Sequence, residues 1–255
     1  MSAQEAALAL FRRSVLKQRK LAEISRALGP TEGLRCLDLG SDNGVVSLLL
    51  RRQGGRWSSA DLTEEAVGAI RDLVGDETYR VDGRTLPFAD GEFDRVVVVD
   101  MLEHVADDAA FVAELARVTR PGGMLVVNTP HVKDTLLRKV RHAIGLTDEK
   151  HGHLRPGYEA ADLTRLFDHR FTLDEHHTYS RFFSELVDTA INFAVERVGK
   201  KSSAKGMVVT GADVKKHRKL FVAYSLVYPI VWVVSKLDAL VPASGYMLIA
   251  RARRT

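Results

Sequence analysis

The chain has very little cysteine: Cys36 stands alone among 255 residues, so no internal disulfide can form. Because Cys36 lies in an apolar stretch with strand character, we expect a buried structural thiol rather than a reactive one. Residues 1–10 also lack the basic start and long apolar run of a signal peptide, and we therefore expect a cytoplasmic location.

A strong excess of one charge is missing as well. The 37 Lys and Arg residues face 33 Asp and Glu residues, which leaves a net charge of +4. This small excess does not favour nucleic-acid binding. His151 and His153 flank a glycine, but no cysteine or further ligand accompanies them at the spacing of a structural zinc site. We therefore expect no metal.

The sequence contains no internal repeat, and its uncharged segment at residues 220–235 is short for a bilayer span. That segment has 16 residues and is interrupted by Pro229. With 45% hydrophobic and 27% charged residues, the composition is that of an ordinary globular protein. The length suits one large α/β domain with a decoration, or two small domains.

Residues 34–44, with the sequence LRCLDLGSDNG, are the stretch around which the chain is organised. An apolar run ends in an acid, two glycines stand four positions apart, and an apolar segment follows. This order predicts a strand, a tight turn and a helix. Glycines let a ligand approach the backbone, and a helix N-terminus attracts negative groups. From this stretch alone, two interpretations remain: the turn binds a nucleotide-type ligand, or it is purely structural.

A second expected strand ends at Asp61, which lies 17 residues beyond Gly44. An acid at that place can accept hydrogen bonds from both hydroxyls of a ribose. Dehydrogenases place an acid similarly, so the spacing alone does not separate the two classes of enzyme. A turn or capping role for Asp61 is the structural alternative.

Several later segments complete a pattern that resembles the class I S-adenosylmethionine-dependent methyltransferases. They are Asp82, LPF at 86–88, LEHV at 102–105 and PGG at 121–123. Together with the first turn and Asp61, they follow the family's order and spacing between residues 30 and 130. Asp42 departs from the pattern, because it stands where the family usually has its middle glycine.

The resemblance implies a Rossmann-like α/β fold, with a seven-stranded, mostly parallel sheet, an antiparallel last strand and helices on both faces. It also implies S-adenosylmethionine as the cofactor, with Asp61 on the ribose, Asp82 on the adenine amino group and Asp100 towards the methionine end. The cofactor-binding residues that it implies are Asp38, Gly40, Ser41, Asp42, Gly44, Asp61, Leu62, Asp82, Gly83, Asp100 and Met101.

From this resemblance we expect methyl transfer to a small-molecule or lipid-like acceptor, with oxygen as the favoured site. The sulfonium is a strong electrophile, so the main tasks of the protein are alignment and exclusion of water. If the acceptor is a hydroxyl, His131 and His153 are the candidate bases; for His104 we favour a role in orienting its loop. Cofactor binding without catalysis and an NAD-type oxidoreductase are the alternatives.

We divide the chain into three parts: a catalytic domain with a helical leader at residues 1–180, a helical insertion at 181–240, and the last strand at 241–255. Within the insertion, residues 200–219 hold seven Lys and Arg against one acid and precede the apolar segment. A helix that is apolar nearly all round must be covered. Its cover is the catalytic domain, a second copy in a homodimer, or an anionic membrane surface met through residues 215–240, at the inner face of the membrane.

Overall fold

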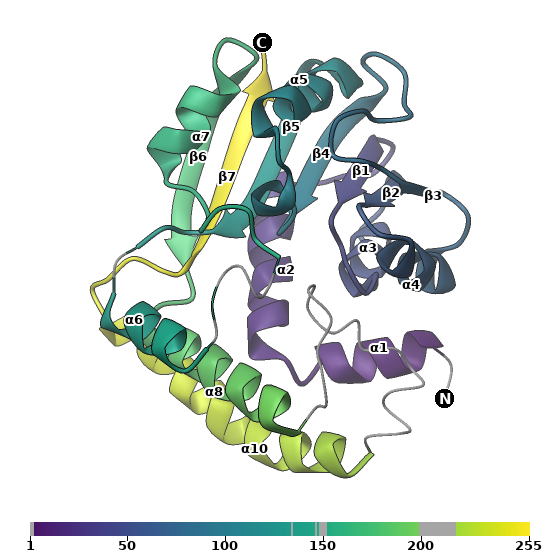
Figure 1. Ribbon diagram of the computed structural model, residues 1–255. Coiled ribbons are helices and arrows are strands. Elements are labelled where there is room, and N and C mark those ends of the chain that lie inside the picture. Colours follow the sequence, from purple (N-terminus) through teal and green to yellow (C-terminus); the bar gives the residue numbers. More distant parts are fainter. Residues whose placement is uncertain (1–2, 134, 146, 148–151, 199–217) are drawn as a thin grey trace.

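The computed structural model describes residues 3–133, 135–145, 147, 152–198 and 218–255. Seven strands form one sheet in the order β3-β2-β1-β4-β5-β7-β6 (Figure 1). β7 runs antiparallel to both of its neighbours, and the other six strands are parallel to one another. The predicted Rossmann-like sheet with an antiparallel last strand is therefore confirmed. The strands are β1 (Arg35–Leu39), β2 (Arg56–Asp61), β3 (Thr78–Arg80), β4 (Phe93–Val99), β5 (Thr119–Pro130), β6 (Phe171–Tyr179) and β7 (Met247–Arg254).

Helices lie on both faces of this sheet (Figure 1). The α-helices are α1 (Ala3–Phe11), α2 (Val15–Leu28), α3 (Val45–Arg51), α4 (Glu64–Val74), α5 (Asp108–Val118), α6 (Leu136–Ala143), α7 (Ala160–Phe167), α8 (Phe182–Val198) and α10 (Arg218–Lys236). Two short 3-10 helices, η1 (Leu102–His104) and η3 (Leu237–Leu240), follow β4 and α10. The sequence predicts a helical leader, seen as α1 and α2, but does not predict α6, which lies after β5. Thr63 caps α4 by accepting a hydrogen bond from the Ala66 N–H at 3.3 Å.

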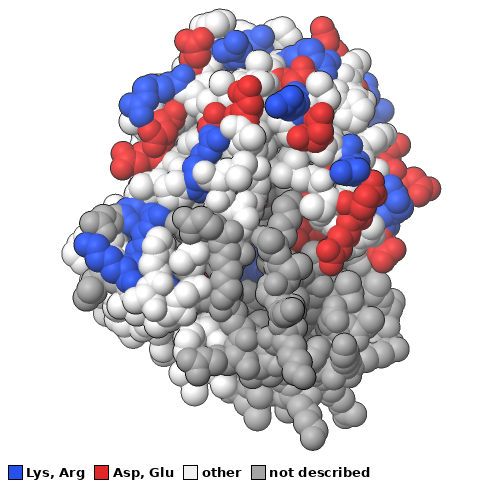
Figure 2. All heavy atoms as spheres, viewed as in Figure 1, with Lys and Arg blue, Asp and Glu red and all other residues white. Residues whose placement is uncertain are grey.

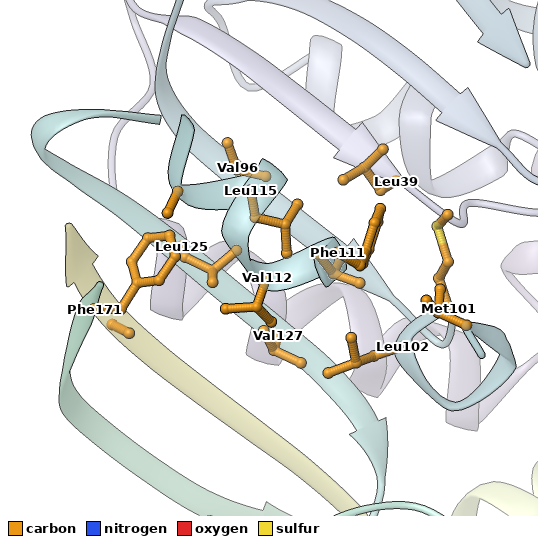
Figure 3. Close-up of a cluster of buried hydrophobic side chains, with 14 of the residues drawn as sticks. Leu39, Val96, Met101, Leu102, Phe111, Val112, Leu115, Leu125, Val127 and Phe171 are labelled. Atoms are coloured by element: carbon orange, nitrogen blue, oxygen red, sulfur yellow. The ribbon is translucent and has the colours of Figure 1, made fainter. Parts of the chain in front are cut away.

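The central strand β4 is buried on both faces over residues 96–99, which explains its continuous run of β-branched residues. Side chains alternate along a strand, so Val96 and Val98 pack in one cluster while Val97 and Val99 pack in the other. On the first face, α5 sets Phe111 against β4 and β5, as Figure 3 shows. The second face is covered by α2 and α3, and the fully buried Cys36 lies there as predicted.

Helices α6, α8 and α10 form a separate layer beyond the end of the sheet at the bottom of Figure 1. α8 packs against α6, α10 and η3, and α10 also contacts α2. Asp238 of η3 ties the layer together, because its buried carboxylate accepts hydrogen bonds from the backbone N–H groups of Arg181, Phe183 and Ser184 at 2.7, 2.9 and 3.2 Å. These contacts attach the start of α8 to η3, which directly follows α10.

α10 continues through Pro229 as a helix. Among the described helices, none combines the length and the apolar character needed to cross a bilayer. The basic residues Lys215 and Lys216 lie outside the described residues.

Candidate functional site

The candidate site lies at the carboxyl ends of the parallel strands. β1 is flanked by β2 on one side and by β4 on the other, so the chain changes direction across the sheet between β1 and β4. In open α/β sheets, ligands bind at such a switch point, outside the carboxyl ends of the strands. The carboxyl ends of β1 and β2 and the loops after β1, β2, β3 and β4 carry the predicted cofactor residues.

The turn between β1 and α3 requires its two glycines. Gly40 has a φ of +85°, and a Cβ on it would lie 2.3 Å from the carbonyl oxygen of Val99 and 2.6 Å from the Cβ of Met101. Gly44 has a φ of +74°, and a Cβ there would lie 2.7 Å from the Cα of Ile70 in α4. Both positions therefore require glycine, because any side chain there would clash with neighbouring parts of the chain. Asp42, between them, has a φ of +52°, a left-handed conformation that glycine adopts more readily.

Asp38 lies beneath this turn with no exposed surface. Its carboxylate accepts hydrogen bonds at 2.6 Å from the hydroxyls of Ser41, Ser47 and Ser59, and it pairs with Arg51 at 3.3 Å. Both carboxylate oxygens are thus engaged within the protein. Asp38 holds the turn in shape, and the Ser41 hydroxyl is committed to it.

Asp61 stands at the end of β2 beside the same turn and is almost fully buried. One oxygen, Oδ2, accepts a hydrogen bond from the Asp42 N–H at 3.2 Å, and Oδ1 accepts from the N–H of Leu62 at 2.7 Å. The predicted ribose acid and the glycine turn are therefore in direct contact.

The loop after β3 places Asp82 and Gly83 at the same edge of the sheet. Asp82 is exposed, and its Oδ1 accepts hydrogen bonds from the N–H groups of Thr85 and Arg84 at 2.9 and 2.8 Å, which lower the pKa of the carboxyl. Gly83 has a φ of +76°, and a Cβ there would lie 3.4 Å from side-chain carbons of Leu62 and Val105. Leu62 and Gly83 are therefore neighbours, so both could contact the same end of one ligand.

Asp100 and Met101 follow β4. Asp100 has a φ of +44°, forms an ion pair with Lys20 of α2, and accepts a hydrogen bond from the Asn128 side-chain amide at 2.6 Å. The Met101 side chain is 1% exposed and packs in the core (Figure 3). The Met101 side chain therefore belongs to the hydrophobic core.

A cavity of about 420 Å³ adjoins Asp100 and lies between the strand ends and the helical layer. Both predicted bases, His131 and His153, line it. His131 directs Nδ1 to the carbonyl oxygen of Gly245 at 2.9 Å. A carbonyl can only accept, so Nδ1 carries the proton and Nε2 has a lone pair.

The walls of the cavity are rich in charge. Lys133 pairs with Glu185 of α8 at 2.8 Å, and Arg141 of α6 pairs with Asp188 of α8 at 3.4 Å. The first pair connects the loop after β5 to α8, and the second joins two helices of the layer, so the insertion forms one wall of the cavity.

Glu103 and His104 also line the cavity, and neither is among the site residues predicted from the sequence. Burial raises the pKa of Glu103 to about 8, and the negative charge of Asp100 adds to this rise. The position of Glu103 and His104 directly after a parallel strand could have identified them as site residues, because ligands bind at the carboxyl ends of the strands in this kind of sheet. Lys20 of α2, which pairs with Asp100, could not be recognised in this way, because a surface helix is expected to carry charged residues.

The model of the methyltransferase domain family matches residues 37–127 of this chain. Ubiquinone biosynthesis O-methyltransferase of Sinorhizobium medicae is 37% identical over 105 residues, which cover 39% of this chain and 42% of the relative. Its namesake from Parvibaculum lavamentivorans is 32% identical over 126 residues, covering 46% and 50%. The chain thus spans at most half the length of these curated relatives.

Solved structures extend the similarity of fold beyond the matched domain. The [4+2]-cyclase SpnF has a TM-score of 0.62 at 17% identity, with coverage of 93% of this chain and 80% of SpnF. An S-adenosylmethionine-dependent methyltransferase from Mesorhizobium loti has a TM-score of 0.56 at 17% identity, with coverage of 92% and 96%. At this identity the likeness establishes the fold, and the chemistry must be argued from the site.

Proposed function

We propose that this chain, which carries a class I methyltransferase domain at residues 37–127, transfers a methyl group from S-adenosylmethionine to an oxygen atom of a small-molecule acceptor. One observation carries the proposal: the glycine turn and the acceptor cavity meet at the end of β4. A Cβ on Gly40 would lie 2.6 Å from Met101, and the residue before Met101, Asp100, lines the cavity. A cofactor at the turn and an acceptor in the cavity would therefore be neighbours.

The proposed cofactor residues divide into two groups. Asp61, Leu62, Asp82 and Gly83 face the nucleoside end, and an acid at the end of β2 suits a ribose because its oxygens accept from hydroxyl groups. Gly40, Asp42 and Asp100 surround the amino-acid end. Asp38, Ser41 and Gly44 act through the shape of the turn, which their packing and hydrogen bonds maintain.

S-adenosylmethionine supplies an electrophilic methyl group, so the protein has to align the acceptor and exclude water. A base that removes the proton of the acceptor hydroxyl would assist. We propose His131 for this task, with His153 as the second candidate, since both line the cavity and Nε2 of His131 has its lone pair. Oxygen as the acceptor atom follows the name of the relatives, which are O-methyltransferases.

Methyl transfer is tested with S-adenosylmethionine that carries a labelled methyl group. The acceptors are phenols and catechols with and without long apolar chains, in line with the ubiquinone in the relatives' name. We expect label in an O-methyl product, and loss of at least about tenfold in rate in His131→Ala if it is the base. Binding of S-adenosylmethionine without transfer to any acceptor would favour the binding protein, and binding of NADH in its place would favour the oxidoreductase.

The helical layer supports a second part of the proposal, contact with an anionic membrane surface. Several apolar side chains of α10 and η3 are exposed, among them Ile230 at 63%, Val233 at 55% and Leu240 at 77%. Lys and Arg gather over the neighbouring helix α6 at the left of Figure 2. Apolar groups beside basic ones suit the interface of an anionic bilayer. A lipid-like acceptor would then enter the cavity beneath residues 181–240, and a homodimer through the same face is the competing arrangement.

A further inference from the structure

Three side chains with metal-binding atoms meet in the wall of the acceptor cavity. Glu103 and His104 belong to η1 after β4, and His153 comes from the loop that follows α6. One candidate ligand atom from each residue lies within 4.8 Å of the other two. Two imidazoles and one carboxylate are a common set of ligands for a divalent transition-metal ion.

Glu103 is the most unusual of the three, because its carboxyl group has no exposed surface. Its Oε2 accepts a hydrogen bond from the Thr129 hydroxyl at 3.2 Å. Its Oε1 is buried and has no hydrogen-bond partner in the part of the chain that the structure describes. A buried carboxylate oxygen without a partner is costly, and a bound cation would remove that cost.

His104 is oriented as a metal ligand usually is. Its Nδ1 lies 2.9 Å from the carbonyl oxygen of Gly152 and therefore carries the proton. The lone pair is left on Nε2. Donation from the second ring nitrogen to a carbonyl is the typical support of a metal-bound histidine, because it fixes both the tautomer and the ring.

The loop that carries His153 is attached to η1 by its backbone. The N–H of Leu154 donates to the carbonyl of Glu103 at 2.9 Å, and Gly152 accepts from His104. The rings of His104 and His153 meet edge to face, with centroids 4.8 Å apart. The residues on both sides of His153 are thus held against η1, so the three side chains keep their relative positions.

We infer that Glu103, His104 and His153 form a binding site for a divalent transition-metal ion, such as Zn²⁺, that opens into the acceptor cavity, which leaves His131 as the base. Imidazole ligands favour these ions over Mg²⁺, which prefers oxygen ligands. Three protein ligands leave coordination positions open. An acceptor oxygen that takes one of them would lose its proton more readily, which extends the proposed methyl transfer.

The sequence alone predicts no metal, because His151 and His153 have no companion ligands near them in the chain. The fold supplies those companions from the loop after β4. His151 itself lies outside the described residues.

The experiment measures metal binding by the full, tag-free chain after treatment with a chelator, without cofactor or acceptor. Zn²⁺ is titrated in competition with a chromophoric chelator, Co²⁺ serves as a spectroscopic probe, and Mg²⁺ is the comparison ion. We expect one Zn²⁺ per chain, d–d absorption bands of bound Co²⁺ and no competition by Mg²⁺. Because metal is measured directly, failure of the methyl-transfer assay would leave this result unaffected.

Glu103→Gln, His104→Asn and His153→Asn should each weaken Zn²⁺ binding by at least about 100-fold and alter the Co²⁺ spectrum. His142→Asn, at another histidine that lines the cavity, is the matched control and should bind like the unchanged chain. Circular dichroism of each variant establishes that it is folded; if Glu103→Gln unfolds, His153→Asn in the loop decides. Absence of saturable Zn²⁺ binding, or equal binding by all four variants, would overturn the inference.

Discussion

The backbone N–H of Asp42 donates a hydrogen bond to Oδ2 of Asp61 at 3.2 Å. This contact joins the turn after β1 to the end of β2, across 19 residues of sequence. Asp42, which departs from the glycine pattern of the methyltransferases, therefore lies against Asp61, the acid proposed to bind ribose. Two substitutions, one at each end of this hydrogen bond, therefore test the cofactor site.

Asp61→Ala should weaken the binding of S-adenosylmethionine and of S-adenosylhomocysteine. Two hydrogen bonds to a charged acceptor would be lost, at a cost of about 2–4 kcal/mol. Calorimetry of both ligands measures the change. Asp72→Ala, the same substitution at an exposed acid of α4, is the control and should bind normally. Unchanged affinity in a folded Asp61→Ala variant would remove Asp61 from the site.

Asp42→Gly should preserve or improve cofactor affinity, because glycine relaxes the left-handed conformation at φ +52°. The net effect on the free energy of unfolding should stay within about 1 kcal/mol, since glycine also gains freedom in the unfolded chain. Asp168→Gly makes the same change at φ +49° at the end of α7 and isolates the effect of strain. Much weaker binding by Asp42→Gly alone would mean that the Asp42 side chain contacts the cofactor directly.

Cys36 should be inert towards Ellman's reagent in the native protein. It has no exposed surface, and burial raises the pKa of its thiol to about 12, so almost no thiolate is present at pH 8. In concentrated guanidinium chloride the same thiol should react fully, with one equivalent per chain. Rapid reaction under native conditions would show that the strand around Cys36 opens readily.

Asp238→Ala should lower the free energy of unfolding by about 2–4 kcal/mol, because three backbone N–H groups at the start of α8 lose their acceptor. Denaturant unfolding measures the loss, and hydrogen exchange should show it first in α8. Asp174→Ala removes only a surface ion pair with Arg253 and should cost less than about 1 kcal/mol. Equal losses in the two variants would contradict the anchoring function of Asp238.

The chain should float with anionic vesicles at low salt and separate from them at high salt. Each basic residue near the surface contributes about 1 kcal/mol, and exposed apolar groups then anchor the protein. Ile230→Ser with Val233→Ser should reduce flotation, as should Glu at positions 215, 216, 218 and 219. Leu154→Ser, at an apolar side chain 62% exposed in the loop beside η1, is the control.

A chain that stays in the soluble fraction with anionic vesicles at low salt would rule out this membrane contact. Sedimentation of the same sample would then distinguish the two remaining arrangements. If the chain is a dimer that dissociates in the Ile230→Ser, Val233→Ser variant, a second copy covers α10. If the chain is a monomer, α10 is covered only by the rest of the same chain.

Local sequence determines much of this protein. The order of strands and helices follows from apolar runs, caps and glycines, because these features act on the backbone within a few residues. The turn after β1 is an example: Gly40 and Gly44 are recognisable before the fold is known, since few other residues tolerate their conformations.

Other properties depend on segments that are distant in the chain. Asp38 matches the cofactor motif, yet hydroxyls from β2 and α3 enclose it and commit it to the turn. His153 lacks ligands in its own stretch, and only the packing of its loop against η1 brings Glu103 and His104 to it. Local patterns cannot reveal such groupings, because a site built from several loops exists only once the sheet has aligned its strand ends.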